Sequence, residues 1–141
     1  MLLALPWFKH LLPLPATKAG LISRETPTAA TEVLLRERPP GPIFNEPSFG
    51  SYLIWAAQPE YPVFVDTRLE LYPPEVWRDY LEISAGREGW EAKLARYGVK
   101  TLMLSPTAQP ALLAAVRDSP DWHLLYEDAA AAIFVRGDAQ E

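Results

Sequence analysis

The chain has 141 residues, a formal net charge of −5 and no cysteine. This length predicts one domain with a single hydrophobic core. The negative charge argues against nucleic acid as a partner, because phosphates attract basic surfaces. The lack of cysteine excludes disulfides and thiolate catalysis.

Residues 1–22 form an apolar arm punctuated by prolines. Lys9 and His10 interrupt the apolar run early, whereas a spanning helix needs about 20 apolar residues. Trp7, Lys9 and His10 are residue types that gather at a membrane interface. We therefore expect either an arm that packs on the domain or the end of a transmembrane helix that begins outside this chain.

Helical and strand patterns alternate along residues 23–137, which we expect to form a single α/β domain, with a disordered tail at 138–141. The first helix is predicted over 26–38, because Thr26 suits the N-cap and Pro27 the first helical position. Prolines and glycines separate the later elements. We predict further helices over 51–57, 73–83, 90–97 and 108–117, and strands over 43–44, 63–65, 99–104, 121–126 and 131–136.

The order of these elements predicts the fold class. Strands that alternate with helices require right-handed crossovers and favour a parallel sheet. The short loop 127–130 joins the last two strands as an antiparallel hairpin. The sequence therefore predicts a three-layer α/β sandwich with a mostly parallel five-stranded sheet and a C-terminal antiparallel hairpin. We expect strand 43–44 to be central, with strand 63–65 beside it.

Charged and amide side chains follow the first two predicted strands. Asn45 and Glu46 come after the first strand, and Asp66 and Arg68 come after the second. In open α/β sheets, ligands bind at the carboxyl ends of strands. Two converging carboxylates there could share acid–base work or bind a cation. The alternative is structural, since Arg68 could pair with Asp66 or Glu46 and hold the loops over the sheet edge.

Aromatic side chains offer a second kind of site, because sugars stack on exposed aromatic faces. At these spacings, packing in the core or in an interface is the commoner role. Tyr72 joins Asn45, Glu46, Asp66 and Arg68 in our set of candidate ligand-binding residues. The aromatic residues considered for a sugar platform are Trp55, Tyr61, Tyr72, Trp77 and Tyr80.

The sequence offers no motif for a catalytic, metal or cofactor site. The phosphate-binding patterns G-x-G-x-x-G and G-K-S/T are absent, so Gly50 is expected to allow a tight turn or a close helix–strand approach. A serine-nucleophile elbow and paired zinc ligands are also absent. We therefore assign no catalytic residue, no metal ligand and no cofactor.

Five short segments carry a resemblance to a known family. They are Phe44-Asn45-Glu46, Gly50-Ser51-Tyr52-Leu53-Ile54-Trp55, Val63-Phe64-Val65-Asp66-Thr67-Arg68, Leu71-Tyr72 and Tyr126-Glu127-Asp128. Over residues 26–136 the chain resembles the C-terminal domain of bacterial polytopic membrane glycosyltransferase-like proteins. These belong to the GT-C class and are similar to dolichyl-phosphate-mannose mannosyltransferases. The chain departs from this pattern at Thr67, where relatives often have glycine.

The resemblance implies a location and a role. Residues 1–15 would be the end of the last spanning helix, and the domain would lie on the extracytoplasmic face of the cell membrane. The catalytic acid of such proteins lies in their membrane part, which this chain lacks. The domain would then be a non-catalytic accessory module. Its partners would be the membrane or the membrane-embedded part of a larger protein, together with a sugar or lipid-linked sugar.

A second hypothesis needs no membrane partner. The chain could be a free-standing small α/β protein that binds a ligand, or a weak hydrolase. Its functional residues would then be Glu46, Asp66 and Arg68. This hypothesis predicts that the apolar arm packs on the domain's own core.

Overall fold

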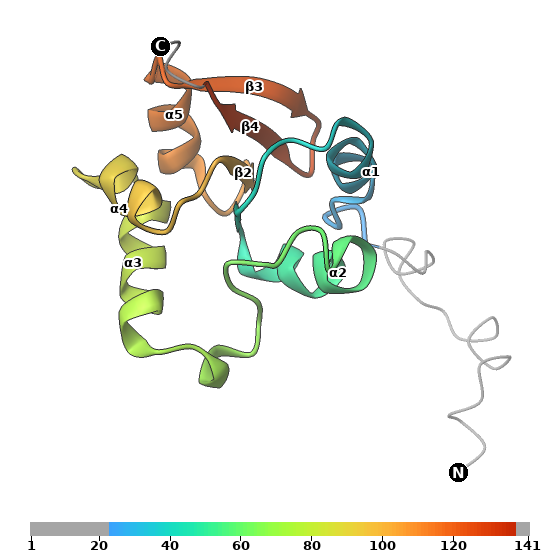
Figure 1. The fold of residues 1–141 in the computed structure, drawn as a ribbon, viewed down its shortest axis with the longest axis horizontal. Coiled ribbons are helices and arrows are strands. Elements are labelled where there is room, and N and C mark those ends of the chain that lie inside the picture. The colour runs from blue at the N-terminus through green and yellow to red at the C-terminus, as the bar shows by residue number, and fades with distance from the viewer. Residues whose placement is uncertain (1–22, 138–141) are drawn as a thin grey trace, which may run out of the picture.

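The computed structural model describes residues 23–137, so the predicted arm at 1–22 and the predicted tail at 138–141 lie outside the described residues. The described part is a mixed α/β fold with five α-helices, one short 3-10 helix and one four-stranded sheet (Figure 1). In chain order the elements are α1 (Thr28–Glu37), β1 (Ile43–Asn45), α2 (Pro47–Ala57), η4 (Leu69–Leu71), α3 (Pro74–Ser84), α4 (Trp90–Arg96), β2 (Thr101–Leu104), α5 (Pro110–Asp118), β3 (Trp122–Glu127) and β4 (Ala132–Arg136).

The sheet has the order β1-β2-β4-β3. Strands β1 and β2 are parallel, whereas β4 is antiparallel to both β2 and β3. The α/β class and the C-terminal hairpin are confirmed. The prediction of a five-stranded, mostly parallel sheet is wrong, because the hairpin supplies half of the sheet and inserts β4 beside β2.

The segment 63–65 was predicted to be a strand, and this prediction is wrong. The segment does run beside β1, but the buried Asn45 side chain replaces the backbone ladder. Its amide oxygen accepts a hydrogen bond from Phe64 N at 2.8 Å, and its nitrogen donates to Val65 O at 2.8 Å. Strand β1 is consequently the last strand at its edge and not central.

Strands β1 and β2 are buried on both faces of the sheet, which explains why their residues are mostly apolar. Phe44, Leu102 and Phe134 align across three strands and pack with α3, α4 and α5. Ile43 and Met103 point to the opposite face, where α1 and α2 cover them. Figure 1 shows these two groups of helices on opposite sides of the sheet.

The start of the first helix differs from the prediction. Helix α1 begins at Thr28, and Pro27 takes the N-cap position without a side-chain capping bond. Thr26 therefore does not cap the helix. The Thr31 hydroxyl donates to Pro27 O at 2.7 Å, an oxygen that also accepts the Thr31 backbone N–H at 2.9 Å.

A buried carboxylate joins α3 to α4. The Asp79 side chain, 4% exposed, accepts hydrogen bonds from Lys93 Nζ at 3.0 Å and from the Tyr97 hydroxyl at 2.7 Å, and it pairs with Arg96. The Tyr97 and Lys93 hydrogen bonds, together with the Arg96 charge, lower the pKa of Asp79 from 3.8 to about 2. This network holds the two helices together because each partner favours the ionised carboxylate.

Candidate functional site

The candidate residues lie where β1 ends, and Asn45 is the first of them. Its side chain is completely buried and its nitrogen also donates to Glu46 O at 2.9 Å. With the bonds to Phe64 and Val65, both the oxygen and the nitrogen of the amide are engaged. Asn45 therefore holds the segment after α2 against the sheet edge.

Asp66 and Arg68 form an ion pair. The Asp66 carboxylate is 1% exposed, and its Oδ2 lies 2.6 Å from Arg68 Nη2. Its Oδ1 accepts the Arg68 backbone N–H at 2.8 Å. The hydrogen bond from Arg68 lowers the pKa of Asp66, and it outweighs the effect of burial. Arg68 is 57% exposed, so the pair consists of a buried anion and a cation at the surface.

Tyr72 lies at the same ion pair. Its hydroxyl is close enough to Asp66 to help lower the pKa of that carboxyl. The pKa of Tyr72 is raised, first by burial and then by the neighbouring Asp66 charge. The structure thus brings Asp66, Arg68 and Tyr72 together.

Glu46 has a different set of partners. It is the N-cap of α2, where its side chain accepts the backbone N–H of Ser48 at 2.8 Å and of Phe49 at 3.3 Å, and the Ser48 hydroxyl. Such a cap satisfies amides that have no partner within the helix. Among the described residues Glu46 makes no hydrogen bond or ion pair with Asp66 or Arg68. Asp66, Arg68 and Tyr72 therefore lie together, whereas Asn45 and Glu46 have separate partners. Ligand binding by these five residues stays a prediction.

Gly50 explains how α2 comes so close to this segment. A Cβ at position 50 would lie 2.6 Å from Val65 O and 2.7 Å from Asp66 Cβ. No side chain fits at such distances unless the backbone shifts. The expectation that Gly50 allows a close approach is confirmed, with an extended segment in place of the predicted strand.

A cavity that the sequence did not reveal lies at the same end of the sheet. It has a volume of about 310 Å³ and lies between the starts of α2 and α5 and the β3–β4 loop. Its lining residues are Arg24, Glu25, Ser48, Phe49, Ser105, Thr107, Ala108, Ala129 and Ala130. The signal in the sequence was Ser105-Pro106-Thr107, which follows β2 just as Glu46 follows β1.

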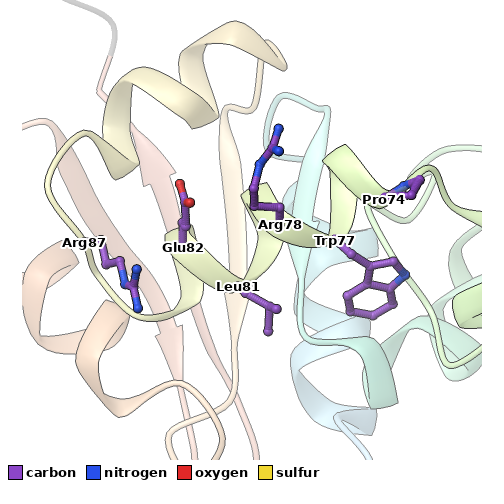
Figure 2. A pocket seen from close by; sticks show the side chains of 6 residues that line it. All are labelled: Pro74, Trp77, Arg78, Leu81, Glu82 and Arg87. Atoms are coloured by element: carbon purple, nitrogen blue, oxygen red, sulfur yellow. The ribbon is translucent and has the colours of Figure 1, made fainter.

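A second hollow lies on the outer side of α3, and its volume is about 480 Å³. Figure 2 shows the Trp77 and Leu81 side chains leaving the helix on one side and Arg78 and Glu82 on the other. Pro74 and Arg87 complete the lining. Leu81 is 61% exposed, so this hollow has an apolar wall that faces solvent.

Of the aromatic residues considered for sugar binding, Tyr61 and Tyr80 are buried in the two cores. Trp77 packs edge-on against Tyr80 and donates its indole N–H to Leu69 O at 3.1 Å. Trp55 is 79% exposed and contacts Tyr52 on α2.

Within residues 23–137, no three His, Asp or Glu side chains lie close enough to form a metal site. None of the helices in this part of the chain has both the length and the apolar character needed to cross a membrane. Comparisons with protein families, curated proteins and solved structures find no match to this chain.

Proposed function

We propose that this domain is a non-catalytic accessory module of a membrane glycosyltransferase-like protein, resting on the extracytoplasmic face of the cell membrane. The observation that carries the proposal is an exposed apolar band on one part of the surface. The sequence resemblance supplies the identity of the larger protein.

The apolar band consists of Trp55, Leu69, Leu71 and Leu81, which are 79%, 56%, 60% and 61% exposed. They account for four of the six large apolar side chains exposed among the described residues, and all four lie between positions 55 and 81. Exposed apolar side chains that share one part of the surface mark an interaction site, whereas scattered exposed leucines need no explanation.

Two contacts connect the three elements that carry the band. The hydroxyls of Ser51 on α2 and Thr67 lie 3.4 Å apart, just before η4. The Trp77 indole on α3 bonds to Leu69 of η4. Elements α2, η4 and α3 therefore present these side chains from adjoining parts of the surface. Tryptophan among leucines is the composition of a surface that enters the interfacial layer of a bilayer.

The contacts of the charged candidates support a non-catalytic role. A general base needs a free lone pair within reach of substrate. Asp66 is buried and bonded to Arg68, and Glu46 is bonded to the first turn of α2. These contacts support a structural role for both carboxylates.

Sedimentation with phosphatidylcholine vesicles tests the proposal on the full chain. Neutral lipid is appropriate because the chain carries a charge of −5 and the band is apolar. Burying one leucine is worth about 1.5–3 kcal/mol, so Leu69→Glu with Leu71→Glu is expected to lower the partition coefficient at least tenfold.

The matched control is Leu124→Glu with Leu125→Glu, which changes two exposed leucines on β3. Circular dichroism checks that both double variants are folded. Equal vesicle binding by the two variants, or no binding by the unaltered chain, would contradict membrane docking through the band.

A further inference from the structure

The cavity of about 310 Å³ lies where the chain leaves two neighbouring parallel strands in opposite directions. From β1 the chain enters α2 on one face of the sheet, and from β2 it enters α5 on the other. In open α/β sheets this divergence opens a crevice at the carboxyl ends of the strands, and ligands bind there. The volume is at the small end of the range for ligand pockets.

The lining combines hydroxyl groups with a small apolar wall. The hydroxyls come from Ser48, Ser105 and Thr107. The apolar wall comes from Phe49 and three alanines. Arg24 and Glu25, of opposite charge, complete the lining. A molecule that presents hydroxyls on its edges and C–H groups on its face matches this lining.

An anion fits the cavity less well, because the backbone amides that would bind it are engaged. Glu46 occupies the amides of Ser48 and Phe49 at the start of α2. Ser105 Oγ accepts the Ala108 amide at 3.1 Å. The Glu46 carboxylate beside these amides would repel further negative charge, and the opposite charges of Arg24 and Glu25 offset each other.

We propose that this cavity binds one neutral monosaccharide unit. The inference deepens the proposed function by naming a ligand class, and it rests on that function for the expectation that a sugar is at hand. It places the sugar between Ser48, Ser105 and the β3–β4 loop, away from the Asp66–Arg68 pair.

The test is an amide-resolved NMR titration of the ¹⁵N-labelled full chain with methyl α-D-mannopyranoside and methyl α-D-glucopyranoside into the millimolar range. We expect saturable shifts at the amides of Phe49, Thr107 and Ala130 with at least one of the two sugars. Inorganic phosphate is the comparison ligand and is expected to give no saturable shift there.

Two variants localise the binding. Ala129→Phe adds a ring in the cavity from an exposed loop position and should abolish the shifts, whereas Ala114→Phe, on the exposed face of α5, should leave them unchanged. Thr107→Val keeps the side-chain shape, removes one hydroxyl and should weaken binding severalfold. The absence of saturable shifts with both sugars, equal shifts in Ala129→Phe, or preferential phosphate binding would overturn the proposal. Because the titration contains no membrane, its failure is distinct from a failure of vesicle docking.

Discussion

The substitution Asn45→Ala tests whether this candidate residue is part of the scaffold. In the native chain the Asn45 side chain bonds to Phe64 N, Val65 O and Glu46 O. Alanine removes all three bonds at a site where no solvent reaches the side chain. A buried backbone group without a partner costs about 1–3 kcal/mol.

The expected loss follows from how far each released group can return to water. Val65 is fully buried, whereas Phe64 and Glu46 are partly exposed. The full cost of an unpartnered carbonyl at Val65 and part of the cost of an unpartnered N–H at Phe64 lower the free energy of unfolding by about 3 kcal/mol. That is a large part of the roughly 5–15 kcal/mol that stabilises a small domain.

Urea unfolding followed by tryptophan fluorescence measures this loss, with the slope m checked for a constant denatured state. Asn45→Asp is the matched variant, because it keeps the shape but replaces the amide donor with an oxygen that faces two carbonyls. In this variant the introduced carboxyl has a raised pKa in the folded state. The loss of stability is therefore largest above the raised folded-state pKa and shrinks as the pH falls to the ordinary carboxyl pKa, where protonation restores a donor. A loss below about 1 kcal/mol in Asn45→Ala would refute the scaffold argument.

Gly50→Ala is expected to destabilise the fold by about 1–3 kcal/mol, because the alanine Cβ would lie 2.6 Å from Val65 O. A thermal midpoint above that of the unaltered chain would show that a Cβ fits at position 50 and would contradict this prediction. Ionised Asp79 contributes at most about 2 kcal/mol, present above pH 3.8 and lost as the pH falls towards 2. Asp79→Asn should flatten that part of the acid unfolding curve, and an unchanged curve would contradict the network. Asp66→Asn should cost about 1.5–3 kcal/mol, since the negative charge and the Oδ2 acceptor of the Arg68 guanidinium are lost. Stability equal to that of the unaltered chain would contradict the structural pair.

Much of the element order follows from local sequence signals. Prolines mark the observed starts of α2, α3 and α5, since proline suits the first helical turn. The hairpin of β3 and β4 follows from two apolar runs separated by a short loop.

The sheet could not be predicted in the same way, because strand pairing depends on partners far away in sequence. Val63-Phe64-Val65 has the pattern of a buried strand, and it does lie at the sheet edge. What removes it from the ladder is the buried Asn45 side chain, 19 residues away from Phe64. Neither residue alone reveals that a side-chain amide takes the place of the backbone hydrogen bonds between two strands.

The candidate residues lie at the end of β1 and in the segment beside it, and their binding of a ligand stays a prediction. The pairing of Asp66 with Arg68 was one of the two alternatives open from the sequence, and the structure contains it. The capping role of Glu46 was readable from its place before Pro47 and Ser48, although the strand-end argument drew attention to its charge. The cavity beside Ser105 was missed because four segments, far apart in sequence, build it.

Protease accessibility of the natural protein tests the central claim most directly. An antibody raised against residues 23–137 would follow the protein in membrane and supernatant fractions of spheroplasts of the source cells. The account predicts that the protein sediments with membranes and that protease added to intact spheroplasts destroys the epitope. Recovery in the supernatant after lysis, or an epitope that is protected until lysis, would contradict a module on the extracytoplasmic face.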